Sequence, residues 1–395
     1  MVVEEASEWS KLPIVLQHQF FAHAEEAAKR CRERIKRQVD AIRRLKGILK
    51  FRPIEGECGE LRVASVDGSW LPARERAGIR AGIYAAGYMV FEGDQLVEEN
   101  YKCEWLTEDQ VGEPRITNII LSLLCVKLER EAALRCLKEE DVDLILIDGN
   151  FYGFRARCSE IMDRMVGVEG FSRGEDLVKH VRDLTTTLAK SGRCVGVAKR
   201  VRIAAIDGWI LKNLGEKHCI GQNDKMILTL LMPPETWFSY EDLLGEGATW
   251  LDCLRYSILR RVYEEHKEYS LDYLWNRWVI DYEKVIFRKN LACAPEDLPT
   301  LMRYFIRCCE APPFCLEVPA GVDLGVVLPY LMSVHNPATG LPLPIDLIDE
   351  NVTLPDGLSR EFVEEVEAAL LRDSGGLSED VLMEWFSSIN PQKEE

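Results

Sequence analysis

The feature that most constrains this fold is an uninterrupted apolar run at residues 144–147, within "LILIDGN". A strand that is apolar at every position is buried on both faces, as at the centre of an α/β sheet. The run follows the acidic turn "KEEDVD" and ends on Asp148. We therefore expect a layered α/β protein with this strand inside its sheet.

A second predicted strand has the same ending. The segment "VASVDG" (63–68) ends on Asp67-Gly68, as "LILIDG" ends on Asp148-Gly149. Asp-Gly is also common turn chemistry, and that interpretation of either pair stays open. In open α/β sheets, however, ligands gather at the carboxyl ends of the strands. Glu131, 17 positions before Asp148 on the preceding predicted helix, is expected to lean over the same edge.

Three carboxylates at one sheet edge predict a divalent metal site. Asp67, Glu131 and Asp148 offer oxygen ligands, which hard cations such as Mg²⁺ and Mn²⁺ prefer to thiols. A further predicted strand, 194–199, ends on Lys199-Arg200, where Lys199 is either a phosphate contact or an ordinary exposed lysine. "AAIDGW" repeats Asp-Gly, but its helical surroundings favour a cap or turn at Asp207.

The rest of the chain alternates between strand-like and helix-like sequence patterns. Residues 77–91 and 96–106 are typical of antiparallel strands joined by a turn at 92–95, and a helical period runs from 116 to 137. The segment 205–300 mixes aromatic residues with arginines 255, 260, 261 and 277; we favour core packing there over stacking on unpaired bases.

Charge is distributed unevenly. Residues 29–52 hold eleven basic and two acidic side chains, which gives +9 and leaves −26 for the rest of a chain of net charge −17. Apolar residues recur there at three- and four-residue steps, so we expect a long amphipathic helix with a basic face. That face is either merely solvated or binds phosphate or a partner; Lys36, Arg37, Arg43 and Arg44 are the candidate contacts.

Composition restricts the class of protein. No apolar run approaches the roughly 18 to 20 residues that cross a bilayer, and "MVVEEASEWS" does not resemble a signal peptide. Thirteen cysteines without a C-x-x-C pair argue against a zinc site and a disulfide framework. We expect a cytoplasmic protein that does not bind membranes.

The order of these motifs resembles the NurA family of prokaryotic nucleases, whose core is RNase H-like. The resemblance covers strand-"VDGS", antiparallel strands, a helical glutamate before "LIDG", a strand ending "VAK", and "GLPLPIDLIDENV" after "LEVP". It implies an α/β fold: an RNase H-like mixed sheet flanked by helices. The expected organisation is a basic amphipathic helix in 1–54, a nuclease domain over 55–355 with a helix-rich insertion at about 205–300, and an acidic helical tail at 356–395.

The resemblance also implies a function. NurA proteins are 5'–3' exonucleases and single-strand endonucleases that favour Mn²⁺, form homodimers and act in DNA end resection with the hexameric ATPase HerA. By this resemblance Asp67, Glu131, Asp148 and Asp349 hold two Mn²⁺ or Mg²⁺ ions. Lys199 stabilises the phosphorus centre, and Arg200 with the basic helix contacts DNA.

Two positions depart from the family pattern. Leu341 and Asp349 stand where the family has a tyrosine and a histidine. Asp349 retains a ligand for a hard cation, but Leu341 lacks a hydrogen-bonding group; His335 is a conceivable substitute for the histidine. An alternative is therefore a catalytically degenerate member that serves a HerA-like motor as a partner or scaffold. A phosphatase of the haloacid dehalogenase type is disfavoured, because Ser65 stands where an aspartate is needed.

Overall fold

The computed structural model describes residues 12–109 and 112–389. The acidic N-terminal decapeptide and the last six residues of the expected tail lie outside the described residues. Within the described part of the chain, no helix is long and apolar enough to span a bilayer. All thirteen cysteines are free, in agreement with the sequence analysis.

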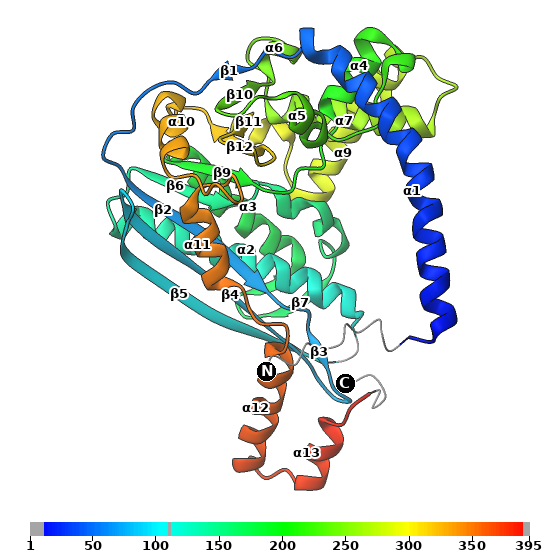
Figure 1. The fold of residues 1–395 in the computed structure, drawn as a ribbon. Helices are drawn as coiled ribbons and strands as arrows, with labels where there is room; N and C mark the ends of the chain where they lie inside the picture. The colour runs from blue at the N-terminus through cyan, green and yellow to red at the C-terminus, as the bar shows by residue number, and fades with distance from the viewer. Residues whose placement is uncertain (1–11, 110–111, 390–395) are drawn as a thin grey trace, which may run out of the picture.

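A mixed sheet forms the centre of the molecule (Figure 1). Its strand order is β1-β10-β11-β12-β9-β6-β2-β4-β3, and β5 also pairs with β4. Strands β2, β6 and β9 are parallel neighbours, whereas β4 pairs with β2, and β5 with β4, in antiparallel fashion. This is the expected RNase H-like mixed sheet. The strand bounds are β1 (Arg52–Pro53), β2 (Arg62–Trp70), β3 (Arg74–Glu75), β4 (Arg80–Glu92), β5 (Gln95–Glu108), β6 (Leu144–Asp148), β9 (Cys194–Ala198), β10 (Thr236–Ser239), β11 (Leu301–Arg307) and β12 (Phe314–Pro319).

Strand β2 corrects one expectation. The sequence predicted that this strand ends at Asp67-Gly68, but β2 continues to Trp70. The reason is that β2 has two neighbours: its parallel pairing with β6 ends at Val66, while its antiparallel pairing with β4 persists to Trp70. A Cβ on Gly68 would lie 2.9 Å from the Sγ of Cys125, so this glycine permits close helix packing rather than a turn.

Helices cover both faces of the parallel strands. Alternate side chains of β2 and β6, among them Val66 and Ile147, join a core with α2 (Pro114–Glu139) and α3 (Gly174–Lys190). The intervening residues, such as Val63 and Leu146, pack with α10 (Leu324–Ser333) and α11 (Leu343–Val352). Each central strand is thus buried on both faces, as its continuous apolarity predicts.

The segment 205–300 is mainly helical and also supplies β10 to the main sheet. Asp207 lies in the first turn of α4 and is buried. It accepts hydrogen bonds from the backbone N–H groups of Ile220 and Gly221 and pairs with Arg260 at 2.6 Å, so it fastens a neighbouring loop rather than capping its own helix. The helices here are α4 (Ala205–Leu214), α5 (Asp224–Leu231), α6 (Glu241–Leu244), α7 (Trp250–Glu265), α8 (Leu271–Tyr273), the π-helix η5 (Leu274–Val279) and α9 (Ile280–Leu291).

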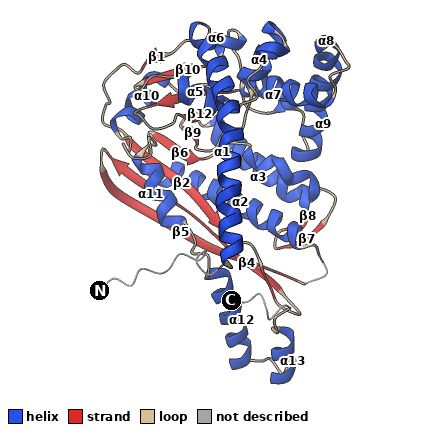
Figure 2. Cartoon of the chain, turned by 45° about the vertical axis from the view of Figure 1, so that its right-hand side comes forward, coloured by secondary structure: helices blue, strands red, loops and turns tan. Residues whose placement is uncertain are grey.

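Both ends of the described chain carry helices that extend from the body (Figures 1 and 2). The predicted basic helix is α1 (Ile14–Arg43), followed by the 3-10 helix η2 (Arg44–Gly47). Only Ile42 of α1 is buried, so most of the helix is exposed. The acidic tail forms α12 (Leu358–Arg372) and α13 (Glu379–Trp385), and Phe386 packs beside Ala81 of β4. The remaining elements are the 3-10 helices η3 (Gly153–Glu160), η4 (Glu216–His218) and η6 (Pro295–Asp297), and the pair β7 (Met165–Val168) and β8 (Phe171–Arg173).

Candidate metal centre

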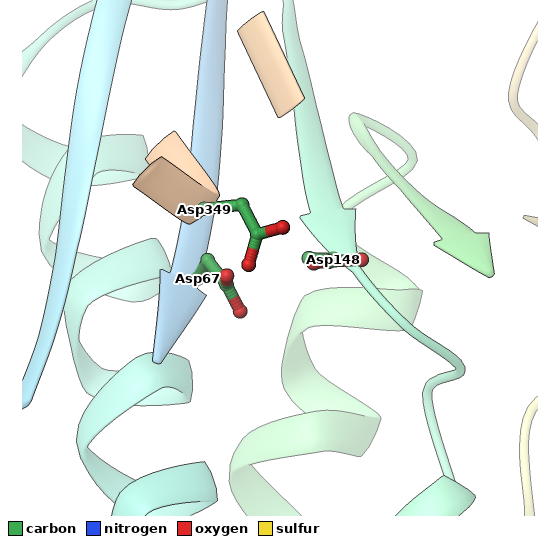
Figure 3. A group of neighbouring side chains, drawn as sticks. All are labelled: Asp67, Asp148 and Asp349. Carbon is green, nitrogen blue, oxygen red and sulfur yellow. The ribbon is translucent and has the colours of Figure 1, made fainter. Parts of the chain in front are cut away.

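Three aspartates converge beside the ends of the parallel strands. Asp67 comes from β2, Asp148 from the end of β6, and Asp349 from α11 (Figure 3). One carboxylate oxygen of each lies within 4.8 Å of the others. This distance suits oxygens that share a cation, because Mg²⁺–O and Ca²⁺–O bonds are about 2.0–2.6 Å long.

Sheet geometry explains the convergence. Side chains alternate between the faces of a strand. Asp67 therefore points to the same face as Val63, and Asp148 to the same face as Leu146. That is the face covered by α11. Because the pairing of β2 with β6 ends at Val66 and Ile147, the next residue of each strand delivers its carboxyl to one position.

The electrostatics indicate an excess of negative charge at this position. Burial, the negative charge of Asp148 and that of Glu129 raise the pKa of Asp67 to about 9. A 2.7 Å hydrogen bond from the backbone N–H of Gly68 opposes this rise. Burial also raises the pKa of Asp148, although the ammonium group of Lys199 opposes the shift. These carboxylates by themselves thus favour a proton at Asp67, whereas a bound cation would favour the ionised form.

Lys199 lies among the aspartates. Its Nζ is 2.8 Å from Oδ2 of Asp148 and 2.7 Å from Oδ2 of Asp349. Burial lowers the pKa of Lys199, but the two carboxylates outweigh burial and the net shift is upward. The lysine predicted at a strand end is therefore a charged member of the cluster, and Arg200 beside it is exposed.

Glu131, the predicted helical ligand, is not where the sequence analysis placed it. Its Oε1 pairs with Nζ of Lys127 at 2.8 Å and lies 3.8 Å from Nε2 of His180. It is absent from the acidic group that the described residues form.

Glu129, which the sequence analysis missed, is the carboxylate of α2 whose charge raises the pKa of Asp67, although it is not one of the three grouped aspartates. Two residues along an α-helix correspond to a rotation of about 200°, so Glu129 and Glu131 point in nearly opposite directions. Glu129 is buried, and burial raises its pKa to about 7, with Asp148 contributing in the same direction. Its carboxylate contacts the guanidinium of Arg130. A signal was available in the sequence. Lys127 and Glu131 have the i,i+4 spacing typical of an exposed ion pair, whereas Glu129 follows Cys125 by four residues and therefore lies on the same helix face as a residue type that is usually buried.

Of the positions discussed for the missing family groups, Asp349 joins the cluster, whereas Leu341 and His335 do not. The side chain of Leu341 packs against the core beneath α10 and α11. Nδ1 of His335 forms a 2.7 Å hydrogen bond with the carbonyl of Met332. The backbone of His335 also forms an isolated antiparallel β-bridge with Pro342. Lys36, Arg37, Arg43 and Arg44 are exposed on α1 and η2, outside the cluster.

Comparisons with known proteins agree with this fold. The family model "NurA domain" matches residues 61–354. The crystal structure of the NurA nuclease from Sulfolobus solfataricus is 14% identical, with a TM-score of 0.53, over 93% of this chain and all of that one. A structure of NurA with manganese is 13% identical (TM-score 0.38; 88% of this chain, 98% of that one), and an endonuclease V from Bacillus subtilis is 13% identical (TM-score 0.34; 82% and 91%).

Among curated proteins, none matches this sequence. The family model, however, spans about three quarters of the chain, and its limits enclose all three aspartates of the cluster. The chain belongs to the NurA family, and this membership supports a nuclease function.

Proposed function

We propose that this protein is a divalent-metal-dependent DNA nuclease. The observation that carries the proposal is the convergence of Asp67, Asp148 and Asp349, whose oxygens lie within 4.8 Å of one another. A carboxylate-only donor set fits Mn²⁺ or Mg²⁺, and burial together with the charges of Asp148 and Glu129 raises the pKa of Asp67, which a bound cation would counter. We propose Glu129, rather than Glu131, as the carboxylate of α2 that supports this cluster, because its charge acts on Asp67.

The chain's own groups supply the rest of the chemistry. Metal ions bound at such clusters, often in pairs, activate water and stabilise the leaving oxygen of a phosphodiester. Lys199 is placed to hold Asp148 and Asp349 in position and to offer positive charge to a phosphate oxygen. Asp349 provides the carboxylate in place of the family histidine, so we propose that the departure at this position keeps the site functional.

The finer assignments come from the family resemblance. We propose 5'–3' exonuclease and single-strand endonuclease activity, in the cytoplasm, in DNA end resection with a HerA-type hexameric ATPase. Homodimer formation has a candidate surface on α1, where Ile14, Leu16, Phe20 and Phe21 are exposed. The basic residues of the same helix, Lys36, Arg37, Arg43 and Arg44, are candidate contacts to DNA.

Digestion of end-labelled single- and double-stranded DNA tests the proposal. Wild-type protein is expected to cut with Mn²⁺ or Mg²⁺ and not with EDTA, while Asp67→Asn abolishes cutting. Lys138→Ala, on the exposed surface of α2, is the control. If correctly folded wild-type protein cuts nothing with either metal, even beside a HerA-type ATPase, the non-enzymatic partner replaces the nuclease as the proposed function.

A further inference from the structure

A basic groove lies beside the metal cluster. It is a cavity of about 1100 Å³ lined by η3, the loop after β9, α7, α9 and β11. The cationic side chains that line it are Arg155, Arg200, Arg202, Arg260, Arg261, Lys289 and Arg303, and the acidic ones are Asp207 and Glu264. The lining therefore carries a net charge of +5 in a chain whose net charge is −17.

Most of these cations are not neutralised by the protein. Arg260 pairs with both acidic residues of the groove, and Arg303 pairs with Glu317. The other five cations of the groove have no carboxylate within 4.0 Å among the residues that the structure describes; these are Arg155, Arg200, Arg202, Arg261 and Lys289. Such concentration of unpaired positive charge in a concave surface attracts anions.

Arg155 shows the lack of compensation most clearly. It is half-buried, its Nη1 donates to the carbonyl of Tyr152 at 2.8 Å, and its guanidinium lies 5.2 Å from the ring centroid of Trp250. Burial and the nearby charge of Arg303 lower its pKa to about 10. An anion in the groove would supply the missing partner.

Two residues that line the groove are close in sequence to residues of the cluster. Asn150 lines it two residues after Asp148, and Arg200 lines it directly after Lys199. The buried Oδ1 of Asn150 has no hydrogen-bond partner among the described residues. Glu317 fixes this corner, because it accepts a hydrogen bond from the backbone N–H of Phe151 at 2.8 Å while pairing with Arg303.

We propose that this groove holds the sugar-phosphate backbone of one DNA strand next to the cluster, with Arg202, Arg261 and Lys289 as its main phosphate contacts. The inference deepens the proposed nuclease function and rests on it. Positively charged grooves with accessible aromatic rings are typical of single-strand sites, and Tyr282, whose ring lies 5.3 Å from the guanidinium of Arg261, is exposed here.

The size of the groove favours one strand over a duplex. Its volume is similar to that of small-molecule pockets, which are roughly 300–1,000 Å³. The cavity therefore accommodates a few linked nucleotides of a single strand.

Salt-dependent binding tests the groove without relying on catalysis. Fluorescence anisotropy of a labelled single-stranded oligonucleotide is measured in EDTA at several salt concentrations. The triple variant R202A/R261A/K289A is compared with the control K138A/K190A/K217A, which removes three exposed lysines outside the groove that likewise lack a nearby carboxylate. Circular dichroism verifies that both variants fold.

The groove variant is expected to bind more weakly, and the slope of log K against log salt should decrease by about 2, since each phosphate contact on a single strand contributes about 0.7. The control should keep the wild-type slope. Equal slopes for both triple variants would overturn the proposal. An equal loss of slope on a duplex of the same length would overturn the assignment to a single strand.

Failure of the groove and failure of the proposed function are distinguishable. If wild type cuts DNA with metal but the groove variant and the control variant bind single strands with the same salt dependence, only the proposal for the groove is refuted. A protein that shows the expected binding loss but never cuts DNA refutes the nuclease function, and the groove is then a DNA-binding site without catalysis.

Discussion

Replacement of Asp67 by asparagine should stabilise the metal-free protein in a pH-dependent way. The pKa of Asp67 is about 9 in the folded protein, against 3.8 for an ordinary aspartate. Between these values the folded state retains a proton that the unfolded chain has lost. Stability contributed by this group is therefore present below pH 3.8 and is lost as the pH rises toward 9.

The magnitude follows from the linkage relation. One pKa unit corresponds to 1.36 kcal/mol. Because pH 7 lies roughly three units above the ordinary aspartate pKa of 3.8, holding this proton in the folded state lowers the free energy of unfolding at pH 7 by about 4 kcal/mol. Asparagine carries no charge, and its amide can donate to Asp148 as the protonated carboxyl does. Relative to wild type, Asp67→Asn should gain up to about 4 kcal/mol in free energy of unfolding at pH 7 and little at pH 4.

Urea unfolding in EDTA at several pH values measures this difference. Adding Mn²⁺ should reverse the order, because a ligand that binds only the folded state stabilises wild type and not the variant. Glu131→Gln, which removes the half-buried partner of Lys127, serves as the control and should change stability by less than about 1 kcal/mol. A stability difference between Asp67→Asn and wild type that is independent of pH would show that the pKa of Asp67 is not raised in the folded protein.

Three further predictions follow from the same contacts. Glu129→Gln should lower metal affinity or DNA cutting about 10- to 100-fold while Glu131→Gln stays near wild type; equal effects in digestion assays would contradict the placement of Glu129. Mn²⁺ binding near pH 7 should release a proton from Asp67, seen by calorimetry as a heat that depends on the buffer's ionisation enthalpy; a buffer-independent heat would argue against it. Glu317→Gln should lower the free energy of unfolding by about 3–5 kcal/mol, because it leaves the buried charge of Arg303 uncompensated; thermal unfolding at the wild-type temperature would disprove this.

Much of the fold was predictable from local patterns. The continuous apolarity of β6 indicated a central strand, and the turn at 92–95 indicated the antiparallel pair β4 and β5. The same patterns located Asp67 and Asp148, because residues that end a buried parallel pairing lie at one sheet edge.

The errors arose where local pattern does not determine orientation. Helix α2 is buried around most of its circumference, so its apolar period does not distinguish Glu129 from Glu131, and only the i,i+4 spacing of Lys127 and Glu131 separates them. The continuation of β2 beyond Asp67 depends on β4, a partner distant in sequence. The groove is also non-local, since elements spread over the chain from Asn150 to Arg303 line it and no single segment shows its charge.

Metal-dependent cutting of DNA by wild type and by Asp67→Asn tests the central claim most directly. End-labelled single-stranded DNA is incubated with Mn²⁺, with Mg²⁺ or with EDTA, and the products are resolved on a denaturing gel. Wild type is expected to cut with metal only, and the variant under no condition. Cutting that persists in EDTA, or in Asp67→Asn with Mn²⁺, would contradict a metal centre built on these aspartates.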